Sequence, residues 1–210
     1  MLNVKLIKTG KWKENCFVIH NSINAGLIID PGQNSDEIIA HIKKNKISVK
    51  AILNTHAHYD HVGAVQILKK TFLIPFYLHS KDSRLLKSVN LYISIFEGEK
   101  IISVPDVDHY FDKNKNPLIF NEISVKIIET PGHTPGSVCF QVEGCLFSGD
   151  TLFEKEIGRV DLPGGNQAEL TKSLIELSKL PPELKLYPGH GNPTTMKQVI
   201  SKNLKLRDLI

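Results

Sequence analysis

Cysteine is scarce in this sequence. The 210 residues contain three cysteines, Cys16, Cys139 and Cys145, which is an odd number with no close pairing. Cys139 and Cys145 lie in apolar surroundings, as is typical of reduced thiols in a core. A chain of this length can bury a large core and does not need disulfides to stay folded. We therefore expect reduced cysteines, which suit a cytoplasmic protein.

Long apolar segments are also missing. No stretch approaches the roughly 20 apolar residues that a membrane-spanning helix needs. The first ten residues, MLNVKLIKTG, contain neither the apolar run nor the small-residue cleavage site of a secretory leader. From these two observations we expect no membrane association and a cytoplasmic location.

The charged residues form no basic block. Lysine and arginine number 26 against 22 aspartates and glutamates, and the lysines are spread along the chain without interleaved aromatic residues. This distribution is typical of solvated helix faces and loops, so we expect no nucleic-acid partner. No stretch has the composition of a linker, and we predict a single domain over residues 1–210.

The apolar patterns predict strands and helices in both halves of the chain. Strands are expected over residues 3–7, 15–20, 25–30, 49–53, 74–79, 117–120, 123–130, 137–142, 144–150 and 184–189. Helices are expected over residues 36–45, 62–71, 80–89 and 167–180, and from about residue 195. Two such halves predict an α/β fold in which two mixed sheets face each other with helices on the outer faces, an αββα sandwich. Residues 88–117 give the weakest pattern: VNLYISIF carries aromatic residues that look exposed, and 97–117 fit a strand pair or a loop.

Three histidines and an aspartate crowd into the short stretch THAHYDH. His56, His58, Asp60 and His61 follow directly on the apolar run KAIL. Imidazoles and a carboxylate crowded at the end of a buried strand are costly in desolvation and repulsion unless a cation compensates them. Histidine and aspartate are common ligands of divalent metals. We therefore interpret the stretch as part of a metal site.

Three further residues of these types follow apolar strands later in the chain. His133 in ETPGHTPGS, Asp150 in LFSGDT and His190 in LYPGHG each come after a strand and a tight turn. Loops at the ends of core strands are where rigid scaffolds present functional groups. We expect these three side chains to join the first cluster.

Other polar residues lack this context. The remaining histidines, His20, His41, His79 and His109, are expected at the surface or as satisfied core residues. Asp30 in IIDPG also ends a strand, and it fits two roles equally well: orienting a metal ligand or forming a turn.

The motifs THAHYDH, PGHTPGS, SGDTLF and PGHG resemble, in this order, the metal motifs of metallo-β-lactamase-fold hydrolases. NCFVI and AGLIIDPG extend the resemblance over essentially the whole chain. Within that superfamily the chain is most similar to the glyoxalase II-like (hydroxyacylglutathione hydrolase-like) group, in which the aspartate of SGD is a bridging ligand. EIGRVDLPGG resembles a segment of its short, single-domain members. Full-length glyoxalase II has an added C-terminal helical domain that helps to hold glutathione, and this sequence stops at Ile210 without one.

The resemblance implies a site for two divalent metal ions, with zinc as the first expectation and iron or manganese as alternatives. It assigns three histidines to one ion, two histidines and an aspartate to the other, and a bridging aspartate to both. In that order the residues are His56, His58 and His133; Asp60, His61 and His190; and Asp150.

Such a site implies a metal-dependent hydrolase. A hydroxide bridging two ions would attack the carbonyl of a small-molecule thioester or ester, which the resemblance suggests could be linked to glutathione. Asp60 would also be catalytic, because its carboxylate can orient that hydroxide. Tyr59 is expected to pack beside the metals or to line the substrate pocket. Arg159 is expected to brace Asp161 or to reach an anionic substrate.

Three alternatives stay open. Persulfide dioxygenases look similar across most of these motifs and hold one iron, here with His56, His133 and Asp150. The segment before GR usually carries a cysteine in those enzymes, whereas this chain has Ile157. A lactone or β-lactam hydrolase on the same metals is the second alternative. A metal-dependent binding or scaffold module without turnover is the third.

Overall fold

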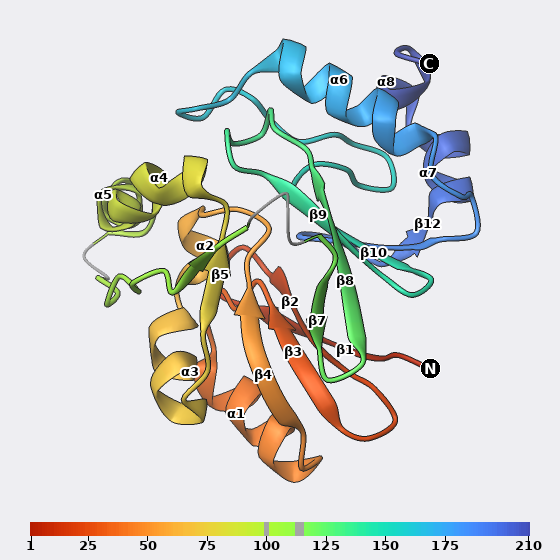
Figure 1. Cartoon of the computed structure of the whole chain (residues 1–210). Helices are drawn as coiled ribbons and strands as arrows, with labels where there is room; N and C mark the ends of the chain where they lie inside the picture. The colour runs from red at the N-terminus through yellow and green to blue at the C-terminus, as the bar shows by residue number, and fades with distance from the viewer. Residues whose placement is uncertain (99–100, 112–115) are drawn as a thin grey trace.

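Two mixed β-sheets form the centre of the structure (Figure 1). The computed structural model describes residues 1–98, 101–111 and 116–210. Within this part, the first sheet has the strand order β1-β2-β3-β4-β5-β6 and the second has the order β12-β11-β10-β9-β8-β7. The strands of the first sheet are β1 (Asn3–Thr9), β2 (Glu14–His20), β3 (Ala25–Ile29), β4 (Ser48–Leu53), β5 (Phe76–Leu78) and β6 (His109–Tyr110). Those of the second are β7 (Leu118–Phe120), β8 (Ile123–Glu129), β9 (Val138–Val142), β10 (Cys145–Gly149), β11 (Lys185–Pro188) and β12 (Thr194–Thr195).

Each sheet combines antiparallel and parallel pairs. In the first sheet, β1, β2 and β3 pair antiparallel, and β3, β4, β5 and β6 pair parallel. In the second, β10 and β11 pair parallel and the other neighbours antiparallel. This pairing makes β8, β10 and β11 end at the same edge of the second sheet.

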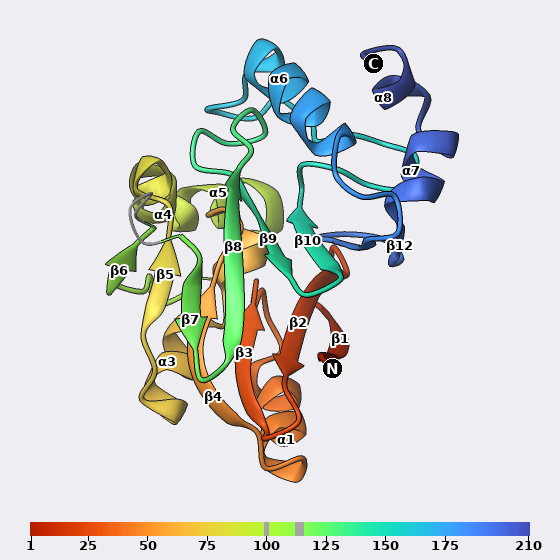
Figure 2. The ribbon, with the colours of Figure 1, turned by 45° about the vertical axis from the view of Figure 1, so that its right-hand side comes forward.

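Helices cover the outer face of each sheet. α1 (Ser35–Lys44) and α3 (Val65–Phe72) pack on the first sheet, and α6 (Gln167–Ser178), α7 (Met196–Lys202) and α8 (Leu204–Arg207) pack on the second. Figure 1 shows the two helix groups on opposite sides of the strands, and the turned view in Figure 2 keeps this order. The predicted αββα sandwich is confirmed.

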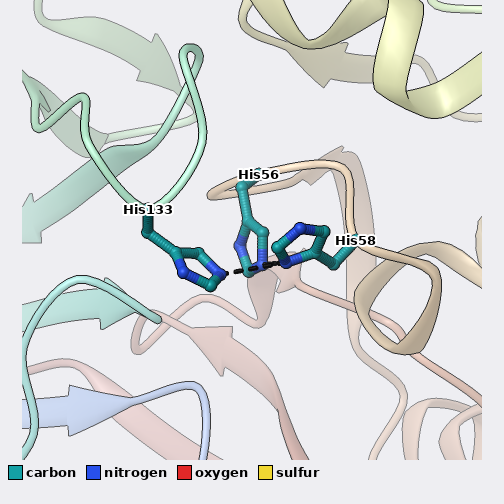
Figure 3. A group of neighbouring side chains, drawn as sticks. All are labelled: His56, His58 and His133. Atoms are coloured by element: carbon teal, nitrogen blue, oxygen red, sulfur yellow. Dashed lines mark hydrogen bonds between the residues drawn. The ribbon is translucent and has the colours of Figure 1, made fainter. Parts of the chain in front are cut away.

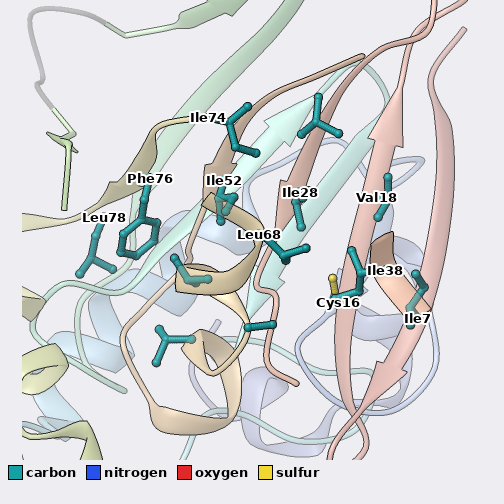
Figure 4. Packing of buried hydrophobic residues seen from close by; sticks show 14 of the residues in the cluster. Ile7, Cys16, Val18, Ile28, Ile38, Ile52, Leu68, Ile74, Phe76 and Leu78 are labelled. Carbon is teal, nitrogen blue, oxygen red and sulfur yellow. The ribbon is translucent and has the colours of Figure 1, made fainter. Parts of the chain in front are cut away.

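Strand residues point alternately into two of the three packed layers. In β2, Cys16 and Val18 contact the layer under α1 and α3 (Figure 4), whereas Phe17 and Ile19 contact the layer between the sheets. A third apolar layer lies between the second sheet and α6 to α8. Because both faces of the central strands are covered, their sequences read as continuous apolar runs. The three cysteines are free and buried in these layers, as predicted.

The predicted helix over residues 62–71 begins three residues later than expected, as α3, and a short helix, α2 (Tyr59–Val62), precedes it. Gly63 and Ala64 form the break between them. A Cβ atom on Gly63 would lie 2.2 Å from the carbonyl oxygen of Gly32, so the turn that follows β3 packs directly against this break. The sequence did not predict the break because this contact joins segments that are far apart in the chain.

The predicted helix over residues 80–89 is also shorter than expected. It begins as the 3₁₀ turn η1 (Ser80–Asp82) and continues as α4 (Ser83–Lys87). The next helix, α5 (Val89–Glu97), covers the stretch VNLYISIF, for which the sequence predicted no element.

Residues 97–117 were expected to be a strand pair or a loop. Their described positions form a loop with the short strand β6, which pairs parallel with β5. Residues 99–100 and 112–115 lie outside the described residues.

Asp82, at the start of α4, ties two distant loops together. Its buried carboxylate accepts hydrogen bonds from the Ala57 backbone N–H at 3.0 Å, the Thr134 hydroxyl at 2.8 Å and the Gly136 backbone N–H at 2.7 Å. Ala57 belongs to the loop after β4, and the other two belong to the loop after β8. These are the loops that carry His56, His58 and His133.

Asp82→Ala should lower the free energy of unfolding by about 2–4 kcal/mol, because three buried donors lose a charged acceptor. Urea denaturation of the purified protein measures this change. The matched control is Asp208→Ala, which removes an exposed aspartate and should change stability by less than about 0.5 kcal/mol. Equal effects of the two substitutions would contradict the role of Asp82.

Candidate metal centre

The residues predicted as metal ligands meet where strands of the two sheets end. One pair follows β4, another lies in α2, and the other three follow β8, β10 and β11. They are His56 and His58; Asp60 and His61; and His133, Asp150 and His190. The ends of paired strands supply a rigid platform, so loops that are distant in the sequence are held side by side.

His56, His58 and His133 form a first group (Figure 3). The Nδ1 atom of His58 lies 3.1 Å from Nε2 of His56 and 2.9 Å from Nε2 of His133. The three rings are turned toward one another, and His56 and His133 are buried. Three ring nitrogens that converge in this way can bind one metal ion.

Asp60, His61 and His190 form a second group beside the first. Oδ2 of Asp60 lies 3.2 Å from Nε2 of His190 and 4.0 Å from Nε2 of His61. A carboxylate oxygen with two ring nitrogens is a second set of metal-binding atoms.

The carboxylate of Asp150 lies between the two groups. One oxygen, Oδ2, is 3.8 Å from Nε2 of His133 and 3.6 Å from Nε2 of His190. The other, Oδ1, is 3.6 Å from Nε2 of His61. The carboxylate of Asp150 is therefore close to His133 of the first group and to His61 and His190 of the second.

Several buried polar atoms of this cluster have no hydrogen-bond partner among the described residues. They include Nε2 of His61 and Oδ1 of Asp150. Buried polar groups in native proteins are nearly always paired, and an unpaired one costs free energy. A cation between these atoms would satisfy them, so the donor set fits divalent metal ions.

Electrostatics at the cluster also favour a cation. Burial and the neighbouring imidazoles lower the pKa of His56 and His58, which keeps both rings in the neutral form that binds metals. Burial acts to lower the pKa of His61, but the carboxylates of Asp150 and Asp60 outweigh it and raise that pKa. The same carboxylates that favour a proton on His61 would also favour a metal ion bound to its ring nitrogen.

Asp30 lies directly behind His61. Its Oδ2 is 3.2 Å from Nδ1 of His61. The carboxylate is itself fixed by the Thr55 backbone N–H at 2.7 Å and the Thr55 hydroxyl at 2.6 Å. Of the two roles the sequence left open, this geometry supports orienting a histidine, an arrangement common behind metal-binding rings.

Backbone carbonyls orient two further rings. Nδ1 of His133 donates to the carbonyl oxygen of Arg159 at 2.8 Å, and Nδ1 of His190 donates to that of Trp12 at 3.2 Å. Each bond places the proton on Nδ1 and leaves Nε2 free to face the centre of the cluster.

Three residues that support the candidate ligands were missed by the sequence analysis. Nδ2 of Asn15 donates to the carbonyls of Pro188 and Gly191, both at 2.9 Å, and so fixes the loop of His190. Asn54 donates to the carbonyl of His61 at 2.8 Å. The third, Glu14, is fully buried, with Oε1 at 3.8 Å from Nδ1 of the same histidine. The sequence feature that could have indicated them is a polar residue in an apolar strand or directly after one.

The two residues predicted near the substrate have different surroundings. The ring of Tyr59 stacks on Phe96, with 6.2 Å between centroids and 12° between planes. Arg159 forms two hydrogen bonds of 2.7 Å with the carboxylate of Asp161, so the structure shows the predicted brace. Arg159 and Tyr59 both also line a cavity beside the cluster.

This cavity has a volume of about 320 Å³. The ring of His58 and the carboxylates of Asp60 and Asp150 form part of its wall, and aromatic and aliphatic side chains form much of the rest. Its size is at the lower end of the range of small-molecule sites, about 300–1,000 Å³. A small substrate in the cavity would therefore touch the cluster directly.

The other histidines lie apart from the cluster. His20 and His41 are partly exposed and His109 is exposed, whereas His79 is buried and accepts a hydrogen bond from the Lys81 backbone N–H. No helix in the described ranges has both the length and the apolar character needed to cross a membrane.

Known proteins share this fold. Residues 9–190 match the model of the metallo-beta-lactamase superfamily. The hydroxyacylglutathione hydrolase GloC of Haemophilus influenzae is 30% identical over 205 residues, which covers 94% of each chain. The crystal structure of the B3 metallo-beta-lactamase BLEG-1 superposes with a TM-score of 0.91 at 36% identity, over 98% of this chain and 99% of that one. The structure of TTHA1623 in a di-iron-bound form gives a TM-score of 0.87 at 33% identity, over 96% and 100%.

The match to the superfamily model covers most of the sequence, and the fold and the histidine–aspartate cluster agree with it. Divalent metal ions are implied by the same cluster. The chain belongs to the metallo-β-lactamase superfamily, as a metallo-hydrolase.

Proposed function

We propose that this protein hydrolyses a small thioester with the help of two divalent metal ions. The observation that carries the proposal is the position of Asp150, whose two oxygens face both groups of candidate ligands at 3.6–3.8 Å. The first ion would be held by His56, His58 and His133, and the second by Asp60, His61 and His190, with Asp150 shared. Zinc is the first candidate, and iron is supported by the di-iron form of TTHA1623.

Two divalent ions bound here would lower the pKa of a shared water and polarise the substrate carbonyl. The chain itself supplies a fixed base beside them. Burial acts to raise the pKa of Asp60, but His61 and His190 outweigh it and hold that pKa well below its usual range. Asp60 therefore stays ionised at neutral pH and can accept a hydrogen bond from the attacking water.

Tyr59 can act on the other side of the substrate. Burial raises the pKa of Tyr59 to about 12. The phenol therefore keeps its proton at neutral pH and can donate a hydrogen bond to a substrate oxygen. Its ring, stacked on Phe96, borders the same cavity.

The choice of a thioester rests on the relative GloC, which is described as a hydroxyacylglutathione hydrolase. A β-lactam is the second candidate, because BLEG-1 is described as a B3 metallo-beta-lactamase. Faster hydrolysis of a β-lactam than of any thioester would assign the second activity. A persulfide dioxygenase with one iron would use His56, His133 and Asp150. It would not use the second group of candidate ligands, Asp60, His61 and His190.

His58→Ala and Asp150→Ala should each lower metal-dependent thioester hydrolysis by about 10³-fold or more, because each removes a proposed ligand. The measurement is kcat/KM with S-lactoylglutathione and with a neutral aromatic thioester, alongside circular dichroism to show that the fold persists. His41→Ala, a histidine substitution on the outer helix α1, should keep full activity. A variant of His58 or Asp150 with near-normal activity would refute the two-metal hydrolase.

Removal of metal separates the hydrolase from the dioxygenase. Dialysis against a chelator should abolish thioester hydrolysis, and adding back zinc, iron or manganese should restore it with two ions bound per chain, because seven candidate ligand residues are present. Elemental analysis and an oxygen electrode supply the measurements. Oxygen uptake with glutathione persulfide and one iron per chain would establish the dioxygenase instead.

A further inference from the structure

The cavity beside the metal centre has two unlike walls. The candidate ligands form one wall, and the other is built from large apolar side chains of four separate segments. Trp12 comes from the turn between β1 and β2, Leu85 from α4, Tyr92 and Phe96 from α5, and Leu162 from the loop after Arg159. An apolar wall facing a metal centre would bind the non-reacting part of a substrate.

α5 supplies much of this wall. It packs against α2, so that Phe96 stacks on Tyr59, the residue next to Asp60. Phe96 nevertheless keeps 43% of its surface exposed, and Trp12 across the cavity keeps 48%. Covering such surface with an apolar ligand gains roughly 25 cal/mol per Å². An aromatic or aliphatic group next to the scissile carbonyl could therefore gain affinity from this wall.

The cavity offers little to a negatively charged carrier. Among the described residues that line it, Arg159 is the one lysine or arginine. Its guanidinium is held by both carboxylate oxygens of Asp161, each at 2.7 Å, and this pair lowers the pKa of Asp161 to about 2. Asp161 occupies Nε and Nη2 of this guanidinium, so a carboxylate on the substrate would have to share the positive charge with Asp161.

We propose that the site prefers substrates with an aromatic or aliphatic group beside the reacting carbonyl and with an uncharged carrier, over substrates carried on glutathione. This preference rests on the proposed hydrolase function, because it assumes that the carbonyl is placed against the ligand wall. The apolar wall selects the group, and the one arginine of the described cavity lining already shares its charge with Asp161, which weakens its attraction for a glutathione carboxylate.

Binding can be measured without turnover, because Trp12 is the single tryptophan of the chain and lines the cavity. Its fluorescence in the metal-loaded protein is titrated with three thioethers that cannot be hydrolysed. These are S-benzyl-N-acetylcysteamine, S-methyl-N-acetylcysteamine and S-benzylglutathione. We expect the first to bind about tenfold or more tightly than the second, from the extra apolar area buried, and more tightly than the third.

Two substitutions on α5 locate the effect. Phe96→Ala should weaken binding of S-benzyl-N-acetylcysteamine by about fivefold or more and leave the methyl compound unchanged, because apolar contact area is lost. Leu91→Ala is the matched control, since Leu91 lies on the same helix, is 60% exposed and is not part of the cavity wall. A melting curve checks that both variants fold. Equal losses in the two variants would overturn the assignment of Phe96.

The hydrolysis rates of the matching thioesters distinguish the two proposals. Faster turnover of thioesters carried on glutathione than of those carried on N-acetylcysteamine would overturn the preference and leave the hydrolase intact. Equal turnover of acetyl and phenylacetyl thioesters would do the same. Selective binding of the neutral aromatic thioether without turnover of any thioester would overturn the hydrolase and uphold the apolar selectivity of the cavity.

Discussion

The charge balance of one buried cluster constrains much of this structure. His61 is fully buried, its Nε2 has no hydrogen-bond partner within the described residues, and carboxylates approach the ring from two sides. A divalent ion bound here would offset the cost of burying these carboxylates, provided that its ligands stay in place. The loops are therefore fixed by buried polar side chains: Asp82 joins those of His58 and His133, and Asn15 holds that of His190.

The αββα sandwich makes this fixation possible. β8, β10 and β11 end at one edge of the second sheet, and β4 of the first sheet ends beside them, so all four loops start from backbone that is covered on both faces. Because this backbone is closely packed, it holds the starting points of the four loops in fixed positions. In the loop after β11, a Cβ on Gly189 would lie 2.2 Å from Oδ1 of Asp150. The loops that follow β10 and β11 are therefore in close contact.

The sequence identifies candidate ligands that the structure brings together, because they are concentrated in short motifs, each directly after an apolar strand. It also predicts the layers, because residues buried on both faces read as continuous apolar runs. It could not reveal Asp82, an isolated aspartate whose partners Thr134 and Gly136 lie 52 and 54 residues away. The break at Gly63 was missed for the same reason, since Gly32 imposes it from another part of the chain.

The helix α5 escaped prediction for a different reason. Its apolar residues do not all face the core: Val89 and Ile93 are buried, whereas Leu91 and Ile95 are exposed on another side of the helix. A helix with apolar residues on more than one side shows no clean amphipathic period. The exposed residues Leu91 and Ile95 blur the period, whereas Phe96, which lines the cavity, continues the buried side of the helix. The wall on which the proposed selectivity rests therefore comes in part from a helix that the metal motifs do not indicate.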